Sequence, residues 1–500
     1  MIADTDEMAL DLLRTPEAGG RVVRGGLVRG VGFGISTALG LATAVLLLRH
    51  LGVVDFGRYA TVMAVLGIVA GITDAGLTAV GSREISVART VAERVHLLNN
   101  LLVLRVVGAG LGVAIAVGFT AVAGYEGAVI AGTAVGGVGV VLISAQSMLT
   151  VPIWVGLRIV SLTAVEVLRN LLTLAGVAVL VVAGAGLLPF FGVQIAVAVV
   201  LIPITIWLAQ IGVRFASGVN RTVIVRLLRE TLPLAVAFAM SVIYFRVLVV
   251  LVSLLSTDVQ TGLFGTSFRI FEMLLGLPAL ILSVALPLLS VAGDEDESRL
   301  RSALQSMTEA SLLIAALLVI GISILADAGI RVVGGDEYVG AASVLRIQAL
   351  ALIPLFVVQT WQLGLIAGRA QRALAVANGL ALALVIVLGL VLIPSGGAEA
   401  AAWVAVAAET ALALFLWIAL DRTHPGGAPN LWFVWKVAVA AGLAAGAGYL
   451  LRDSPLVAAC VATIVFAAVA VVIRAVPLDL YHGLGFRWGE GDEDDDEETP

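Results

Sequence analysis

The sequence predicts an all-α integral membrane protein with about fourteen transmembrane helices. Three observations lead to this prediction: the composition, the length of the apolar segments, and the distribution of arginine. Of the 500 residues, 60% are hydrophobic and 13% are charged, whereas a soluble domain carries about 25% charged residues. Helices suit such a chain because they satisfy every backbone polar group internally, which the bilayer core cannot do.

Apolar segments long enough to cross a bilayer recur along the chain. A hydrocarbon core of about 30 Å needs about 20 apolar residues per helix. By this measure the predicted spans are approximately 30–50, 58–81, 98–122, 127–151, 162–184, 189–212, 231–255, 263–291, 308–328, 340–366, 374–395, 398–420, 431–450 and 455–475. The segments 263–291 and 340–366 are long for one span, so we expect them to tilt or to extend beyond the bilayer.

The arginines indicate how these spans are oriented. If the N-terminus is cytoplasmic and the sides alternate, most arginines at the span ends and between the spans fall in the cytoplasm. Arg49, Arg58, Arg331 and Arg452 are the exceptions. Cytoplasmic loops of membrane proteins carry such an excess of positive charge. The sequence therefore predicts a multi-pass protein of the cell membrane with both termini cytoplasmic.

The order of the spans indicates two similar lobes. Six spans precede a basic segment and return the chain to its starting side, so a second set of six would repeat the first in the same orientation. A short sequence similarity between the two sets supports this. Gly57 and Gly262 each stand two residues before an aromatic residue where a span begins. The predicted organisation is a cytoplasmic N-terminal segment 1–29, an N-lobe 30–213, a basic cytoplasmic linker 214–230, a C-lobe 231–420, two further helices within 421–476, and an acidic cytoplasmic tail 477–500.

Some charges inside the spans have a simple structural explanation. A charge at the centre of a span costs on the order of 2.5–3.5 kcal/mol on insertion scales. Arg105 lies close enough to a span end for its long side chain to reach the membrane surface. Glu166 and Arg169 are three residues apart on one helix face and could pair with each other.

Asp74, Arg246, Arg269, Glu272 and Glu409 are harder to explain in this way. Arg246 and Arg269 fall at comparable depth on spans that are adjacent in sequence, and Glu272 shares a helix face with Arg269. These charges could form buried structural ion pairs, or they could line a hydrated and partly cationic cavity between the lobes. Because the arginine side chain matches phosphate and carboxylate oxygens with a planar fork of donors, such a cavity suits an anionic substrate.

Several segments in a fixed order resemble one known family. They are Leu51–Tyr59, Asp74–Glu84, Tyr244–Arg246, Gly262–Glu272 followed by Leu277 and Pro278, Gly335–Tyr338, and Ala342–Ile347. Together they resemble the Wzx-type oligosaccharide and polysaccharide flippases, which are polysaccharide transporters of the multidrug/oligosaccharidyl-lipid/polysaccharide exporter (MOP) superfamily. The resemblance covers about residues 25–420. Members of that family often carry an acidic residue two positions after the arginine at 246, where this chain has Leu248.

The resemblance implies a transporter rather than an enzyme, with a fold like that of the multidrug (MATE) exporters. It implies that the chain flips an oligosaccharide linked to a polyprenyl phosphate or diphosphate, of undecaprenyl or dolichyl type. The transfer runs from the cytoplasmic to the external leaflet by alternating access, for cell-surface polysaccharide or glycoprotein glycan synthesis. In this interpretation Arg246 and Arg269 bind the phosphate, and Asp74, Glu272 and Glu409 serve gating or ion coupling.

The expected partners are the lipid-linked oligosaccharide, membrane lipids and glycan-assembly proteins, without nucleic acid. No cofactor or metal site is expected, because the single cysteine, Cys460, lies in an apolar run and no nucleotide-binding G-x-x-x-x-G-K-[ST] motif occurs.

Three alternatives remain open at this point. A cation-coupled multidrug exporter of the same superfamily would concentrate carboxylates and aromatic residues in its cavity, yet only 6% of the residues are aromatic. A membrane glycosyltransferase or glycan polymerase would need a carboxylate pair or metal-binding acids in a sizeable external loop, but the external loops here are short and their longest carboxylate pair is Asp336 and Glu337. A passive assembly scaffold is the third.

Overall fold

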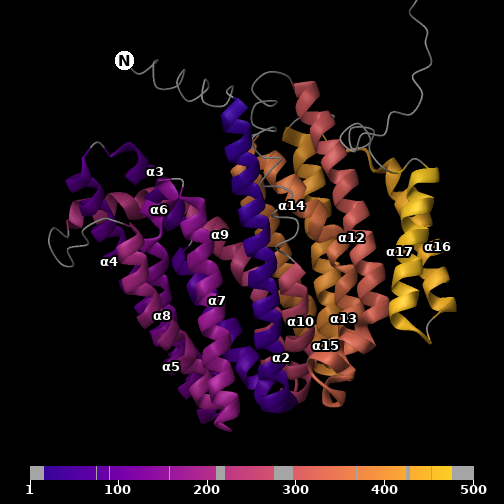
Figure 1. Ribbon diagram of the computed structural model, residues 1–500, viewed down its shortest axis with the longest axis horizontal. Helices are drawn as coiled ribbons and strands as arrows, with labels where there is room; N and C mark the ends of the chain where they lie inside the picture. The colour runs from indigo at the N-terminus through magenta and orange to yellow at the C-terminus, as the bar shows by residue number, and fades with distance from the viewer. Residues whose placement is uncertain are drawn as a thin grey trace, which may run out of the picture. The chain divides into compact units, whose positions relative to one another are not determined.

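The structure is a computed structural model that describes residues 16–74, 76–88, 90–156, 158–209, 220–274, 297–367, 370–423, 428–451, 453–473 and 475. Every regular element within these ranges is helical, as the composition predicts (Figure 1). The acidic tail 477–500, residues 275–291 of one predicted span, and Leu277 and Pro278 lie outside the described residues.

The described residues form fifteen α-helices and two short 3-10 helices. They are α2 (Pro16–Asp74), α3 (Leu77–Val87), α4 (Val91–Val122), α5 (Gly127–Leu149), α6 (Val151–Val155), α7 (Ile159–Val182), α8 (Leu187–Ala209), α9 (Arg221–Leu255), α10 (Asp258–Leu274), α12 (Glu297–Val333), η1 (Asp336–Tyr338), α13 (Gly340–Leu350), α14 (Leu352–Ala367), α15 (Gln371–Thr423), η2 (Leu431–Phe433), α16 (Val434–Leu450) and α17 (Pro455–Val472).

Ten helices in the described ranges are long and apolar enough to cross a membrane, and Ala239–Leu255 is a shorter apolar helix. The difference from fourteen has identifiable causes. The 60-residue stretch Val28–Val87 and the 52-residue stretch Arg372–Thr423 are each counted as one candidate, where the sequence predicts two spans. Residues 263–291 are described only as far as Leu274. The chain is a multi-pass membrane protein, and the number fourteen stays a prediction.

Two glycines with positive φ bend these long helices. Gly52 in α2 has a φ of 69°, and Gly397 in α15 has a φ of 54°. Residues with a Cβ rarely adopt this region, so glycine is the residue that permits a sharp turn between two helical segments. Each bend falls where the sequence predicts a break between two spans.

Other helix ends differ from the predicted ones. The predicted span 340–366 is two helices, α13 and α14, separated at Ala351. The basic segment 214–230 is helical from Arg221, where α9 begins. Asn220 caps this helix, because its side-chain oxygen accepts a hydrogen bond from the backbone N–H of Thr222. The backbone N–H of Asn220 donates in turn to Asn100 Oδ1 at 2.8 Å, which ties the start of α9 to α4.

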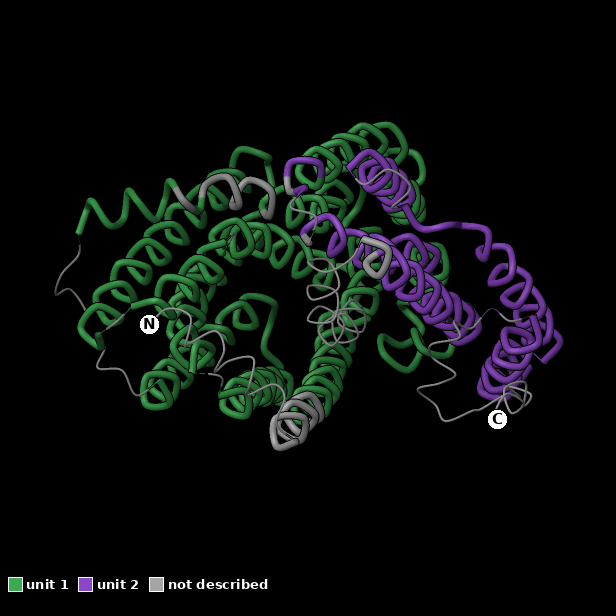
Figure 2. The backbone as a smooth tube through the Cα atoms, turned by 90° about the horizontal axis from the view of Figure 1, so that it is seen from above, with its two compact units in different colours: residues 1–280, 327–348, 374–408 green, residues 281–326, 349–373, 409–500 purple. Residues whose placement is uncertain are grey.

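The described chain divides into two compact units, coloured separately in Figure 2. Unit 1 contains Met1–Leu280, Asp327–Gln348 and Leu374–Ala408, and unit 2 contains Ile281–Ala326, Ala349–Ala373 and Glu409–Pro500. These units are not the two six-helix lobes expected from the order of the spans. The lobes stay a prediction.

Helices in unit 1 pack closely because glycines remove side chains at their crossings. The α5 and α8 helices lie side by side (Figure 1), and a Cβ on Gly132 would stand 2.4 Å from the ring of Phe191. The α2 and α10 helices approach even more closely at Gly57 and Gly262. A Cβ on Gly57 would stand 2.3 Å from the Asp258 carbonyl oxygen, and one on Gly262 would stand 2.0 Å from the Val53 carbonyl oxygen. Small residues permit such backbone approach in membrane helices.

Unit 2 is held together by small residues and by polar contacts between its helices. Ala444 and Gly448 of α16 and Ala462 of α17 are buried where these two helices pack. The indole N–H of Trp361 donates to Thr308 Oγ1 at 3.0 Å, and both side chains are buried. This bond connects α14 to α12 and leaves neither polar group unsatisfied.

Candidate functional site

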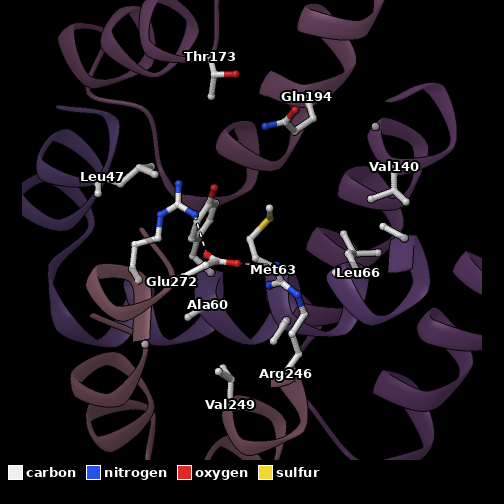
Figure 3. Close-up of a pocket in the computed structure, with 18 of the residues that line it drawn as sticks. Leu47, Ala60, Met63, Leu66, Val140, Thr173, Gln194, Arg246, Val249 and Glu272 are labelled. Atoms are coloured by element: carbon white, nitrogen blue, oxygen red, sulfur yellow. Dashed lines mark hydrogen bonds and ion pairs between the residues drawn. The ribbon is translucent and has the colours of Figure 1, made fainter. Parts of the chain in front are cut away.

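A cavity of about 500 Å³ lies within unit 1. Its walls come from α2, α5, α7, α8, α9 and α10. The charged side chains among its lining residues are Arg169, Arg246, Arg269 and Glu272, so arginine outnumbers carboxylate. Figure 3 shows Arg246 and Glu272 directed toward each other, while Thr173 and Gln194 lie on a different part of the wall. The charged groups of the described lining therefore carry a net positive charge, while apolar side chains form most of the wall.

Glu272 joins the two arginines that the sequence placed at similar depth. Its carboxylate accepts from Arg246 Nη2 at 2.6 Å and from Arg269 Nη1 at 2.9 Å. The three side chains are 22% to 44% exposed, so they face the cavity and are not enclosed by protein. The pairing with Glu272 supplies the acidic partner that Leu248 does not, and Leu248 itself is buried.

A glycine of α2 makes room for the Arg246 guanidinium. A Cβ on Gly67 would stand 2.6 Å from Arg246 Nε, and one on Gly71 would stand 2.3 Å from a methyl group of Val242. The α2 and α9 helices therefore approach closely, and the Arg246 side chain lies against bare backbone. Sequence reasoning missed Gly67, because its role depends on a neighbour on another helix.

Arg169 of α7 lines the same cavity, and its partner is not Glu166. Its Nη2 donates to Gln146 Oε1 of α5 at 2.6 Å, and Glu166 is exposed. The Nε of Arg169 is buried and has no hydrogen-bond partner among the described residues. Sequence reasoning missed this contact, because Gln146 is 23 residues away along the chain.

Asp74 lies in a different cluster and does not line the cavity. Its carboxylate binds Arg105 Nη1 and accepts from the Thr78 hydroxyl at 2.6 Å. Arg105 also donates to Ser147 Oγ at 3.2 Å. The prediction that Arg105 reaches the membrane surface is wrong: its side chain is 5% exposed because its guanidinium is held by groups of α2 and α5.

Glu409 is buried in unit 2, with 7% of its surface exposed. It is not among the residues that line the cavity of unit 1. The cavity therefore contains three of the five predicted site residues: Arg246, Arg269 and Glu272.

A second ion-pair cluster surrounds the bend in α2. Arg58 contacts the carboxylates of Asp55 at 3.0 Å, Glu126 at 2.7 Å and Asp258 at 3.1 Å. These acids come from α2, from the turn before α5 and from the start of α10. The cluster fastens the turn before α5 and the start of α10 to the first turns of α2 that follow Gly52.

Tyr338, which is fully buried, anchors η1 near the same bend. Its hydroxyl donates to the Leu48 carbonyl at 3.1 Å. Burial, reinforced by the charge of Glu337, raises the pKa of Tyr338 well above its ordinary value. The hydroxyl is therefore protonated at neutral pH and available as this donor.

No group of three or more histidine, cysteine, aspartate or glutamate side chains within the described ranges is placed to hold a metal ion.

A family comparison matches residues 22–292 to the polysaccharide biosynthesis protein family. This match covers the cavity and more than half of the chain. The chain belongs to the polysaccharide biosynthesis protein family. This family is described by its role in polysaccharide biosynthesis.

Solved structures show the same fold at low sequence identity. The inward closed conformation of the lipid II flippase MurJ has a TM-score of 0.77 at 13% identity, covering 92% of this chain and 100% of MurJ. An inward-facing multidrug resistance MATE transporter has a TM-score of 0.63 at 14% identity, covering 80% of this chain and 98% of that chain.

A MOP superfamily transporter from Pyrococcus furiosus has a TM-score of 0.56 at 14% identity, covering 82% of this chain and 97% of that chain. That transporter is described as having a binding pocket of reverse polarity that suggests a different function. No curated protein sequence matches the chain. The predicted MATE-like fold is therefore confirmed for this member of the polysaccharide biosynthesis protein family.

Proposed function

We propose that this transporter flips an oligosaccharide linked to a polyprenyl phosphate or diphosphate from the cytoplasmic to the external leaflet by alternating access. The observation that carries this proposal is the charge of the cavity wall, where three arginines face one glutamate. Membership of the polysaccharide biosynthesis protein family makes a glycan the natural cargo. The phosphate link supplies the negative charge that the cavity would attract.

The arginine pair is suited to a phosphate group. Arg246 and Arg269 converge on one carboxylate, so two guanidinium groups already surround one anion. A phosphate oxygen can accept the same charge-assisted hydrogen bonds, and arginine can present two donors at once. Glu272 would occupy the phosphate position while the cavity is empty. The incoming phosphate would have to displace it.

The size of the cavity fits a headgroup but not a complete lipid. Ligand sites commonly measure about 300–1,000 Å³, and this cavity of about 500 Å³ lies within that range. Several sugars and a phosphate would fill it. The polyprenyl chain would remain in the bilayer, since the headgroup would leave no room for it in a cavity of about 500 Å³.

The cation-coupled multidrug exporter remains the rival proposal. A positively charged drug would meet like charge in this cavity, which costs binding free energy. Transport assays on purified protein in liposomes separate the two proposals. The flippase cargo would be a polyprenyl-diphosphate-linked N-acetylglucosamine whose sugar carries an NBD fluorophore, and the drug would be ethidium.

If the chain is a flippase, added dithionite bleaches nearly all of the NBD fluorescence. Protein-free liposomes should lose only about half, because dithionite does not cross the membrane and reaches only the outer leaflet. Ethidium transport without loss of the inner-leaflet fluorescence would contradict the proposal and support the exporter.

Replacing Glu272 with glutamine tests whether it competes with the phosphate. The amide removes the negative charge, so we expect inorganic pyrophosphate to bind about tenfold more tightly than it binds the unaltered protein. Isothermal titration calorimetry on the purified protein measures this affinity. Glu399→Gln is the matched control, since Glu399 is exposed and does not line the cavity. Equal or weaker binding by Glu272→Gln would show that Glu272 does not compete with phosphate.

The proposed direction of transport also requires a definite topology. We predict that Asn220, in the connection before α9, is cytoplasmic and that Thr257, between α9 and α10, is external. Green fluorescent protein and alkaline phosphatase fused after each residue would report the side, since the first fluoresces in the cytoplasm and the second is active outside. Reversal at either position would contradict the predicted orientation.

Asp74 and Glu409 stay proposals for gating or ion coupling. The contact between Asp74 and Arg105 is compatible with either role, because an ion pair that forms in one state and breaks in another can do both. Asp74 is half-exposed, so water can reach the carboxylate.

A further inference from the structure

Arg169 is a second cationic position in the cavity and lies on a different helix from the arginine pair. It comes from α7, whereas Arg246 and Arg269 come from α9 and α10. Its Nη2 is occupied by Gln146, and its buried Nε has no hydrogen-bond partner in the described part of the chain. An unpartnered buried donor costs free energy unless a ligand satisfies it.

The partner of Arg169 positions the guanidinium without neutralising it. Gln146 is fully buried, and its Nε2 donates to Thr205 Oγ1 at 2.9 Å. This bond fixes the amide so that its oxygen faces Arg169. Because an amide carries no net charge, the positive charge of Arg169 is retained at the cavity wall. Among the described carboxylates, none lies within 4 Å of Arg169, and Glu166 acts on it only through its more distant charge.

Hydroxyl and amide side chains are the other polar groups near Arg169 in the described lining. Ser144 of α5, Thr173 of α7 and Gln194 of α8 line the same cavity. Figure 3 shows Thr173 and Gln194 well away from Glu272. Hydroxyl and amide side chains can both donate to and accept from sugar hydroxyls. This wall is therefore suited to the glycan and not to the phosphate link.

We infer that Arg169 binds a carboxylate carried by the glycan, so that the preferred substrate contains an acidic sugar. This inference rests on the proposed function, which places the phosphate at Arg246 and Arg269. A carboxylate has one negative charge, which the single guanidinium of Arg169 balances. Because Arg169 lines the cavity, its guanidinium can donate charge-assisted hydrogen bonds to the carboxylate oxygens.

Two sugar phosphates that differ in one group test this inference. α-D-Glucuronic acid 1-phosphate carries a carboxylate where α-D-glucose 1-phosphate carries a hydroxymethyl group. We expect the purified full-length protein to bind the acidic sugar phosphate about tenfold more tightly. Inorganic pyrophosphate is the third ligand, because it offers a second phosphate without a sugar. All affinities are measured by titration calorimetry at one ionic strength, since salt screens charge.

Variants of Arg169 assign the preference to this side chain. Arg169→Gln should bring the ratio of the two sugar-phosphate dissociation constants close to one, and Arg169→Lys should give an intermediate ratio. Arg246→Ala should weaken both sugar phosphates by a similar factor. Arg226→Gln is the control for the loss of one positive charge, since Arg226 is 53% exposed and does not line the cavity. Size-exclusion profiles establish that each variant is folded.

Each result has a definite meaning. Equal affinity of the unaltered protein for the two sugar phosphates would overturn the carboxylate site and leave the proposed function intact. If Arg169→Gln weakens pyrophosphate as strongly as the acidic sugar phosphate, Arg169 holds a second phosphate, and the inference is wrong. If the unaltered protein binds none of the three ligands, the proposed phosphate site fails, and the inference fails with it.

Discussion

Arg246→Ala is expected to lower the affinity of the purified protein for inorganic pyrophosphate by about ten- to hundredfold. One hydrogen bond to a charged group contributes about 1.5–3 kcal/mol, which corresponds to this range. Arg269→Ala should act in the same direction but less strongly, because Arg269 is 44% exposed and Arg246 only 26%. Water competes better for the more exposed guanidinium.

The conservative variant separates charge from geometry. Arg246→Lys keeps the positive charge but loses the planar fork, so we expect it to recover only part of the affinity. Gly67→Ala tests the same position from the opposite helix, since its Cβ would stand 2.6 Å from Arg246 Nε and displace the guanidinium. Arg226→Ala, which removes an exposed charge outside the cavity lining, is the control.

The same variants are then compared in the liposome assay, together with their abundance in the membrane. Loss of NBD flipping at normal abundance supports the binding role. Full flipping by both Arg246→Ala and Arg269→Ala would contradict the proposal that these arginines bind the phosphate. Low abundance of both variants would indicate that the arginine pair serves mainly as a structural ion pair with Glu272.

Gly262→Ala is expected to lower the melting temperature of the purified protein clearly. Its Cβ would stand 2.0 Å from the Val53 carbonyl oxygen. Because the obstacle is backbone and not a flexible side chain, α2 and α10 must move apart. Overpacking of this kind costs about 1–3 kcal/mol. Gly57→Ala should act in the same way, since it meets the Asp258 carbonyl at 2.3 Å.

Gly110→Ala in α4 is the matched control, because nothing lies within 4 Å of its added Cβ. In an open helical position, alanine is favoured over glycine by up to about 1 kcal/mol. This variant should therefore melt at or above the temperature of the unaltered protein. If Gly262→Ala also melts at or above that temperature, the close crossing of α2 and α10 is not tight in solution.

The sequence predicted the helical membrane fold and marked Arg246, Arg269 and Glu272 as charges at depth, because both depend on local or repeated signals. Apolar length predicts spans without knowledge of their neighbours. Arg246 and Arg269 could be placed at one depth by counting residues, and Glu272 shares a face with Arg269. The similar positions of Gly57 and Gly262 suggested a repeat, and the structure adds that the two glycines lie at one helix crossing.

What the sequence could not provide is the rotation of each helix about its axis. The spacing allows Arg169 to pair with Glu166, one turn away, but Arg169 contacts Gln146 on α5. Arg105 was expected at the membrane surface, but it faces Asp74, 31 residues earlier in the chain. Such pairings depend on which face of a helix packs inward. When nearly every position of a span is apolar, the hydrophobic pattern does not mark that face.

The bridge that Glu272 makes between Arg246 and Arg269 has a consequence for the empty transporter. In the proposed cycle the protein must return to its starting conformation without cargo. Enclosing two bare guanidinium groups during that return would carry a heavy desolvation penalty. An internal carboxylate provides them with a counter-ion that never leaves the protein. The protein without cargo can therefore return to its starting conformation without binding an anion from either side of the membrane.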